Sequence, residues 1–217
     1  MVNIKKGDFI EIEYTGRTKE GIVFDTTYED VAKKNKIHNK DASYGPIVIC
    51  IGQNHILSGL DKRIQGKNLG EYDFELTIEE GFGKKTAKLL RLIPMSAFRK
   101  QDIQPVPGLQ FNIDGINGVV KTVSGGRVII DFNHPLAGKE LVYHVKINKL
   151  VEELNEKIKA LIKIQFGLKD NDFNIKIEND IVEIKLNKKI NIPPEIEKLF
   201  KDNAIELTKV KDINIVK

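Results

Sequence analysis

A tyrosine, a phenylalanine and an aspartate come together early in the sequence, at Tyr14, Phe24 and Asp25. The segment 10–14 alternates apolar and acidic residues, which is typical of a half-buried strand. Glycines on either side of the polar run 17–20 indicate a turn, so a second strand would bring Phe24 and Asp25 back beside Tyr14. An apolar pocket with one carboxylate is typical of a small-molecule or peptide site. The alternative is that both rings are ordinary core and Asp25 caps a strand end.

The elements that must position this pocket are strands with one short helix. The segment 28–44 reads as a loop with one helical turn around 29–33. The apolar run 47–51 is short enough for a buried strand, and 71–78 alternates without a fault. Between them, 55–64 carries its apolar residues on a single helical face. This order predicts an α+β fold in which an antiparallel half-barrel sheet wraps around a short helix.

Composition narrows the class of protein. The 217 residues allow one large domain or up to three smaller ones. Cys50 is the single cysteine and lies in an apolar run, which predicts a buried, inert thiol and excludes an internal disulfide framework. We see neither signal peptide nor membrane span and expect a cytoplasmic protein without a membrane partner. We expect no metal and no cofactor, because the histidines are scattered: His38, His55, His134 and His144.

Four motifs carry a resemblance to a known family. They are Tyr14-x-Gly16, the 21–26 string Gly-x-Val-Phe-Asp-Thr, the 52–60 string Gly-Gln-Asn-His-Ile-Leu-Ser-Gly-Leu, and the 131–141 string Asp-Phe-Asn-His-Pro-Leu-Ala-Gly-Lys-x-Leu. In this order they resemble the FKBP-type peptidyl-prolyl cis-trans isomerases, in particular the SlyD-like and long archaeal branch. The resemblance covers roughly residues 1–150.

The resemblance implies an apolar cup for a proline ring. Asp25 would be its one charged member, hydrogen-bonded to Tyr14 or a nearby group, with Leu60 as the floor and Phe82 at the lip. Two positions depart from the family pattern, because Leu60 stands where many relatives have tryptophan and Phe82 lacks a tyrosine hydroxyl. The implied catalytic residues are Asp25, Tyr14, Phe24 and Tyr143, and the implied substrate-binding residues are Ile47, His55, Ile56, Leu57, Leu60 and Phe82.

The segment 84–131 is an insertion with its own character. It carries eight Lys and Arg against three Asp and Glu, a local charge of +5. Short strands and a turn at 124–126 predict a small β-rich domain. The resemblance implies an insert in the flap over the proline site that captures unfolded chains, with Ile93, Met95 and Phe98 as its apolar contacts. The alternative is that these three residues form the core of the domain. An RNA-binding patch ranks lower, since interleaved stacking aromatics are missing.

The segment 151–217 reads as a separate α+β module for dimerisation or partner docking. Its core would be marginal on its own, so we expect it to pack against a partner or the main body. The expected elements are a helix at 151–162, strands at 173–177 and 181–186, a helix from Pro193-Pro194 through Phe200, and strands at 204–210 and 213–216.

Together these patterns predict a peptidyl-prolyl cis-trans isomerase with chaperone activity, whose partners are unfolded or partly folded polypeptides with X–Pro bonds. The predicted domains are 1–83 plus 132–150, 84–131, and 151–217. One alternative is a holdase whose cup binds peptides with little catalysis. A ribosome- or RNA-associated factor using the basic insert is a less favoured alternative, so nucleic acid is not expected as a partner.

Overall fold

Two long antiparallel strands, β1 (Phe9–Thr18) and β9 (Leu141–Leu150), form the centre of a five-stranded sheet. The computed structural model describes residues 3–113, 116–187 and 190–216. The strand order is β2-β1-β9-β4, and β3 pairs with β1 as well. The remaining strands of this sheet are β2 (Val23–Thr26), β3 (Ile47–Cys50) and β4 (Gly70–Leu76).

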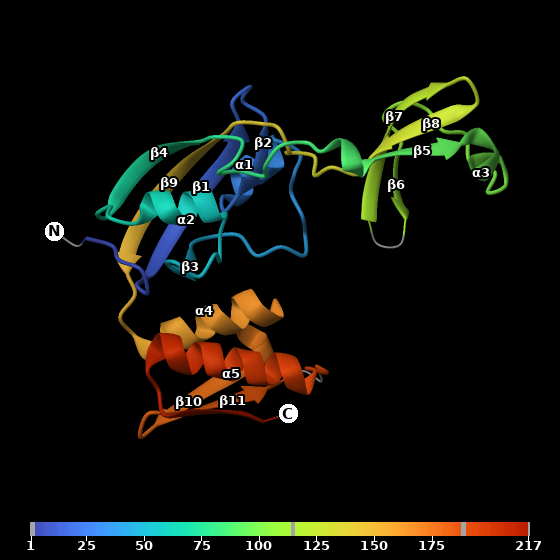
Figure 1. Cartoon of the computed structure of the whole chain (residues 1–217). Coiled ribbons are helices and arrows are strands. Elements are labelled where there is room, and N and C mark those ends of the chain that lie inside the picture. The colour runs from blue at the N-terminus through green and yellow to red at the C-terminus, as the bar shows by residue number, and fades with distance from the viewer. Residues whose placement is uncertain (1–2, 114–115, 188–189, 217) are drawn as a thin grey trace. The chain divides into compact units, whose positions relative to one another are not determined.

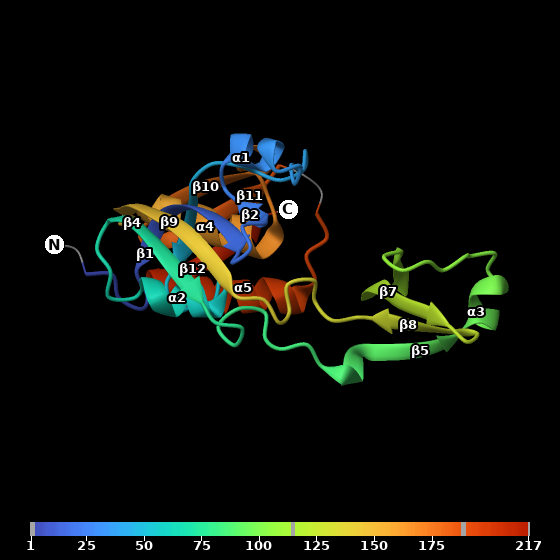
Figure 2. The ribbon, with the colours of Figure 1, turned by 90° about the horizontal axis from the view of Figure 1, so that it is seen from above.

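Side chains from alternate positions of this sheet meet a short helix, α2 (Ser58–Ile64). Ile10 and Ile12 of β1 are fully buried, as are Leu60 and Ile64 of α2, which are four residues apart and therefore share one helix face. Figures 1 and 2 both show α2 alongside β4, β9 and β1. The predicted α+β half-barrel around a short helix is thereby confirmed.

The start of α2 differs from the prediction, which placed a helix over 55–64. Asn54 has a positive φ of 54°, and Leu57 has an extended ψ of 128°. The carboxylate of Asp61, buried in α2, accepts hydrogen bonds from the backbone N–H groups of Gly52 and Asn54 at 2.9–3.1 Å. Residues 52–57 are therefore an ordered turn. The helical turn expected around 29–33 is present as α1 (Glu29–Lys34).

Residues 77–140 fold as a second compact unit, separate from the unit formed by 1–76 and 141–217. The predicted insert, 84–131, lies inside this second unit. Its four-stranded antiparallel sheet has the order β5-β8-β7-β6. The elements are a 3-10 turn at Ala87–Leu89, β5 (Leu90–Pro94), α3 (Met95–Arg99), β6 (Gln110–Ile113), β7 (Ile116–Ser124) and β8 (Arg127–Asp131).

The small core of the second unit corrects one of the predicted contact residues. Phe98 is 6% exposed and packs with Val120, Val128 and Ile130. Ile93 and Met95 are partly buried against the same cluster. Phe98 is therefore part of the core of the small domain, as the alternative interpretation predicted, and has little surface left for a partner. The hairpin turn expected at 124–126 is confirmed, because Gly125 and Gly126 both have positive φ between β7 and β8.

The C-terminal segment packs two helices on a three-stranded sheet of order β10-β11-β12. The turn between β10 and β11 uses Asn179 and Asp180, both with positive φ, and α5 carries the chain over to β12, which is parallel to β11. The elements are α4 (Leu154–Phe166), a 3-10 turn at Asp170–Asp172, β10 (Phe173–Glu178), β11 (Ile181–Leu186), α5 (Pro194–Thr208) and β12 (Asp212–Val216).

One element of this segment was predicted wrongly. Residues 204–208 continue α5 instead of starting a strand at 204–210. Phe200 and Ala204 are both buried, four residues apart on the inner face of the helix. The helix ends where Lys209 adopts a left-handed conformation, with φ 61°. The strands expected at 173–177, 181–186 and 213–216 are present.

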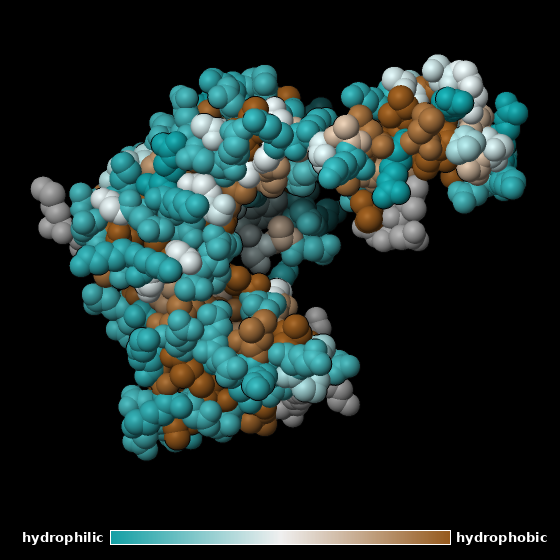
Figure 3. Space-filling model, viewed as in Figure 1, coloured by the Kyte–Doolittle hydropathy of each residue, from teal (hydrophilic) through white to brown (hydrophobic). Residues whose placement is uncertain are grey.

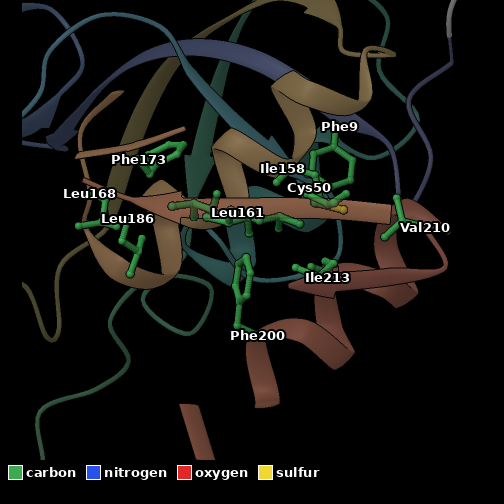
Figure 4. Close-up of a cluster of buried hydrophobic side chains, with 14 of the residues drawn as sticks. Phe9, Cys50, Ile158, Leu161, Leu168, Phe173, Leu186, Phe200, Val210 and Ile213 are labelled. Atoms are coloured by element: carbon green, nitrogen blue, oxygen red, sulfur yellow. The ribbon is translucent and has the colours of Figure 1, made fainter. Parts of the chain in front are cut away.

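The C-terminal segment shares its hydrophobic core with two strands of the first sheet. Phe9 of β1 and Cys50 of β3 are buried in the same hydrophobic cluster as Ile158, Leu161 and Phe200. Figure 4 shows these side chains converging between the strands of the first sheet and the C-terminal helices. The expectation that this module packs against the main body is confirmed. Cys50 is 1% exposed, and burial raises the pKa of its thiol to about 12, as expected for an inert cysteine.

Candidate functional site

The predicted pair Tyr14 and Asp25 meets at the junction of β1 and β2. The Tyr14 hydroxyl donates a hydrogen bond to Asp25 Oδ2 at 2.8 Å, which confirms the predicted partner. The register explains the meeting, because Thr15 pairs with Thr26 and Gly16 pairs with Asp25. Asp25 itself is exposed, so its carboxylate lies at the rim of the site and is oriented by the partly buried tyrosine.

Three aromatic rings converge above a glycine. The Tyr143 ring lies 5.8 Å from that of Tyr14 and 5.7 Å from that of Phe24, the latter edge to face. Gly16 lies opposite Tyr143 in the β1–β9 register. A Cβ at Gly16 would come within 2.8–3.0 Å of the Tyr143 and Phe24 rings, so only glycine allows the rings to meet here.

Two buried threonines fix the backbone of Tyr14. The backbone N–H of Tyr14 donates to Thr27 Oγ1 at 2.9 Å, and its carbonyl accepts from Thr26 Oγ1 at 3.1 Å and from Thr27 Oγ1 at 3.3 Å. Thr26 Oγ1 also lies 2.9 Å from Thr15 Oγ1. These bonds hold the chain before α1 against β1. They also fix the backbone position from which the Tyr14 ring extends.

Both tyrosines of the site remain protonated donors. Burial raises the pKa of Tyr14, and the charge and hydrogen bond of Asp25 raise it further. Burial also raises the pKa of Tyr143, with a further contribution from the charge of Asp25. Neither hydroxyl can act as a base near neutral pH. The site therefore offers hydrogen-bond donors, one exposed carboxylate and apolar rings.

A cavity of about 240 Å³ lies beside these residues. Tyr14, Phe24 and Asp25 line one part of it, and the predicted substrate-binding residue Ile47 lines another. The segment that closes it includes Tyr44, whose hydroxyl accepts a hydrogen bond from the Asn39 backbone N–H at 2.9 Å. The cavity thus joins three of the predicted catalytic residues to β3 and the 39–44 loop.

The other predicted site residues lie in different places. Ile56 and Leu57 are partly buried in the turn before α2, and Leu60 is buried beneath them in the sheet–helix core. His55 does not line the 240 Å³ cavity, because its Nδ1 accepts the Cys50 backbone N–H at 3.1 Å and the ring borders a second cavity. Phe82 belongs to the second unit, where its ring stacks on His134 at 4.1 Å. Its place at the lip of the cup stays a prediction.

Within 3–113, 116–187 and 190–216, no group of three or more His, Cys, Asp or Glu side chains is arranged to hold a metal ion. In the same ranges, no helix has both the length and the apolar character needed to cross a membrane.

Comparison with known proteins decides the family. The chain is 36% identical over 150 residues to the short-type peptidyl-prolyl cis-trans isomerase of Methanocaldococcus jannaschii, an alignment that covers 68% of this chain and 94% of the relative. The chain belongs to the FKBP-type peptidyl-prolyl cis-trans isomerases. It is also similar to the FKBP-type isomerase SlyD of Haemophilus influenzae, with 28% identity over 162 residues, covering 72% of this chain and 77% of that protein.

Two further matches fall outside the part that carries the cup of this FKBP. The family model described as FKBP26, IF domain, matches residues 91–136. The model described as FKBP26 C-terminal matches residues 154–210.

The SlyD protein of Helicobacter pylori is 31% identical over 127 residues, covering 56% of this chain and 68% of that protein.

Sequence reasoning missed how several residues position the aromatic rings of this FKBP. Gly16 was identified as a turn residue and as part of a family motif, but not as the position whose missing side chain brings the rings together. Thr26 appeared only as the last residue of a family motif, and Thr27 gave no pattern. A signal was available, since two adjacent threonines after a short strand are well suited to bind neighbouring backbone groups.

Proposed function

We propose that this protein catalyses cis–trans isomerisation of X–Pro bonds in folding polypeptides and holds unfolded chains through its insert. The observation that carries the proposal is the Tyr14–Asp25 hydrogen bond at the rim of a cavity bordered by Phe24 and Ile47. The reaction needs no nucleophile. Isomerisation breaks no bond and requires only that the twisted amide be favoured.

The reaction sets the requirements. Rotation about the peptide bond crosses about 18–20 kcal/mol, because the C–N bond has partial double-bond character. For X–Pro bonds this makes exchange take tens to hundreds of seconds, slow enough to limit folding. A catalyst must bind the twisted amide more tightly than either planar form. Removing water from the planar amide and fixing the proline ring both favour that form.

The residues of the cup can supply these effects together. Phe24, Tyr14 and Tyr143 offer ring faces and edges to a proline ring. Burial keeps the Tyr143 hydroxyl protonated, and we assign it as a donor to the substrate carbonyl. Asp25 orients Tyr14 and places a negative charge at the rim, so we assign it an electrostatic and orienting role and not that of a general base.

The test of the cup is turnover of a short proline peptide by the intact protein, Asp25→Ala and Tyr143→Phe. We expect Asp25→Ala to lose most of kcat/KM and Tyr143→Phe to lose a smaller part, about tenfold for one hydrogen bond made in the transition state. The matched control is Asp30→Ala, an exposed acid in the first turn of α1 that lies outside the cavity. Equal activity of Asp25→Ala and Asp30→Ala would exclude the assigned role of Asp25.

Capture of unfolded chains is assigned to the second unit because of its exposed apolar surface. Figure 3 shows hydrophobic side chains gathered on the visible face of this unit. A core of four buried residues leaves many apolar side chains outside it. Exposed apolar patches of this kind commonly mark protein-binding surfaces. The exposed members are Leu89 (40%), Leu92 (57%), Ile103 (38%), Val106 (51%) and Ile116 (59%).

The test of capture is refolding of a proline-limited protein by the intact chain and by Leu92→Asp. We expect Leu92→Asp to accelerate the protein substrate less than the intact chain while turning over the short peptide normally. Ile22→Asp is the matched control, since Ile22 is equally exposed at 60% but lies in the β1–β2 turn. If the intact protein suppresses aggregation yet leaves the slow folding phase unchanged, the protein is a holdase and the isomerase proposal fails.

Dimerisation through 151–217 is proposed as the assembly state. The three-stranded sheet has β10 and β12 as its outer strands, and α5 exposes Ile196 and Leu199, the latter by 60%. Outer strands and exposed apolar helix residues are surfaces that a second copy could cover. Sedimentation equilibrium of the intact chain and Leu199→Glu tests this proposal. A monomer at all concentrations would exclude it.

A further inference from the structure

A second cavity, of about 630 Å³, lies in the first unit between β3 and the C-terminal helix α4. Its volume is within the range of about 300–1,000 Å³ typical of ligand clefts. On one wall are residues of β3 and the preceding loop, and on the other are Lys159, Lys163 and Ile164 of α4. We call this cavity the interdomain cleft.

The interdomain cleft adjoins the 240 Å³ cavity that contains Tyr14 and Asp25. Ser43, Tyr44 and Ile47 line both cavities. A polypeptide bound in one cavity therefore has the other cavity beside it. An X–Pro substrate in the cup is one residue pair of a longer chain, so its flanking residues must lie somewhere along this surface.

The walls of the interdomain cleft suit a polypeptide. β3 has β1 as its strand partner, and no other described strand pairs with it. Ile164 is 41% exposed and offers an apolar contact. Glu11 and Asp41 line the sheet side of the cleft, and the helix side carries Glu156 as well as two lysines.

Part of this charge is already neutralised, since Lys163 pairs with Asp170 at 2.8 Å and Glu11 lies 3.6 Å from Lys149. A wall of mixed sign with an apolar centre disfavours a nucleic acid, which would need a continuous basic surface. It fits the alternating backbone and side-chain chemistry of an extended peptide.

We propose that the interdomain cleft binds the polypeptide segment that flanks the X–Pro bond of the substrate, so that the C-terminal helix α4 forms part of the isomerase binding site. The four residues of β3 extend about 13 Å at roughly 3.3 Å per residue, so the flank must reach at least four residues beyond the proline pair. This inference rests on the isomerase function proposed for the cup. It adds the site that distinguishes a folding chain from a short proline peptide.

The experiment compares a tetrapeptide containing one X–Pro bond with two longer peptides that have the same centre and six extra residues, before or after it. Turnover is measured for the intact protein, Ile164→Asp and Lys159→Glu. Ile181→Asp and Lys198→Glu are the matched controls. Ile181 is 42% exposed, Lys198 is exposed on α5, and neither lines the interdomain cleft.

With the intact protein, one of the two longer peptides should show a KM about tenfold lower than the tetrapeptide, at similar kcat. Ile164→Asp and Lys159→Glu should remove that gain while leaving tetrapeptide turnover unchanged, and the controls should retain it. A length gain that survives both cleft variants, or no gain at all, overturns the inference. Failure of the intact protein to turn over the tetrapeptide overturns the proposed isomerase function instead.

A second measurement does not depend on the variants. A photoreactive group at the distal end of the longer peptide should attach to residues 159–164 of α4 in the intact protein, as read by mass spectrometry. Attachment only to the second unit, or to the outer face of α5, would place the flank elsewhere and contradict the interdomain cleft as its site.

Discussion

The C-terminal segment completes its core with Phe9 and Cys50 of the isomerase sheet, whereas the second unit buries Phe98, Val120, Val128 and Ile130 from within its own residues. Among the residues that the structure describes, the first cluster contains sixteen buried residues and the second contains four. The sheet and the C-terminal segment should therefore unfold together, because neither can keep its apolar surface buried without the other. The second unit can open by itself.

This contrast suggests a division of work. The Tyr14–Asp25 site lies in the unit that contains the larger buried cluster. The surface to which we assign capture of unfolded chains lies in the unit with the small core, where five of the described apolar side chains are at least 38% exposed. Elements that adapt to partners are drawn from the less stable parts of a protein.

The largest expected effect is on the shared core. Phe200→Ala removes a ring that is 3% exposed and lies 4.8 Å from the Phe166 ring, and should lower the free energy of unfolding by about 3–5 kcal/mol. Hydrogen exchange should increase in β1 and β3 as well as in α4 and α5. Phe98→Ala, the matched change in the second unit, should increase exchange in 84–131 alone. Unchanged exchange in β1 after Phe200→Ala would contradict a shared core.

The next effect compares two glycines that each lie beneath an aromatic ring. A Cβ at Gly16 would approach Tyr143 and Phe24 to 2.8–3.0 Å, and one at Gly118 would approach the Phe132 ring to 2.7 Å and Ile130 to 2.9 Å. Gly16→Ala should displace the cup rings and lower kcat/KM on a short proline peptide by about 100-fold. Gly118→Ala should leave that turnover within about twofold, since no cup residue contacts it in the second unit, and should slow refolding of a protein substrate. Similar peptide turnover by both variants would break the comparison.

A smaller effect uses Cys50 as a reporter of the shared core. Leu161→Ala should loosen the contact between α4 and β3, since Leu161 is 4% exposed in the same cluster as Cys50. Reaction of the thiol with a disulfide reagent at pH 8 should become at least about tenfold faster than in the intact protein, through more frequent local opening. Val128→Ala in the second unit is the control and should leave the rate unchanged. Equal acceleration by both variants would show that the two units open together.

The smallest effect concerns pH. Burial lowers the pKa of His55, whose Nδ1 accepts the Cys50 backbone N–H. Well above pH 6.5, His55 is neutral in both the folded and the unfolded protein. As the pH falls below 6.5, His55 of the unfolded chain is protonated first. The free energy of unfolding therefore decreases until the pKa of His55 in the folded protein is reached. The intact protein should lose about 2 °C of melting temperature more than His55→Asn between pH 7 and pH 5. Asn retains an acceptor but does not titrate. Identical pH profiles would contradict a lowered pKa of His55 in the folded protein.

Local patterns predicted the elements on which the cup is built. The alternation in 10–14 and in 71–78 predicted which strand faces are buried. The Gly16–Gly21 spacing predicted a turn over 17–20, but β1 continues through Gly16 to Thr18, and the connection to β2 is 19–22. Those signals are strong because each depends on residues two to four apart. The hairpin between neighbouring strands placed Phe24 and Asp25 beside Tyr14, whereas the hydrogen bond of Asp25 was implied by the resemblance to the FKBP family.

What the sequence could not reveal depended on distant contacts. Ile205 and Leu207 alternate with polar residues, so 204–210 resembles a strand until Phe200 and Ala204 are seen packing on α4. Phe9 and Cys50 look like ordinary strand residues, and nothing local shows that their outer faces meet a domain 100 residues later. Phe98 was ambiguous because an apolar residue beside Pro94 reads equally as surface contact and as core.

The two chain segments at the base of the insert are fastened to each other. Asp131 accepts hydrogen bonds from Lys85 Nζ and from the backbone N–H of Asn133 at 2.9–3.0 Å. Asn133 Oδ1 in turn accepts the Thr86 backbone N–H at 2.8 Å, and its Nδ2 donates to the Thr86 carbonyl at 3.1 Å.

These contacts join the two ends of the insert. The entropic cost of bringing the ends together is therefore offset by bonds within the insert and not by the host sheet. A segment of this kind can be exchanged as a cassette. The same isomerase body could receive a different binding domain at 85 and 133 and keep its catalytic site unchanged.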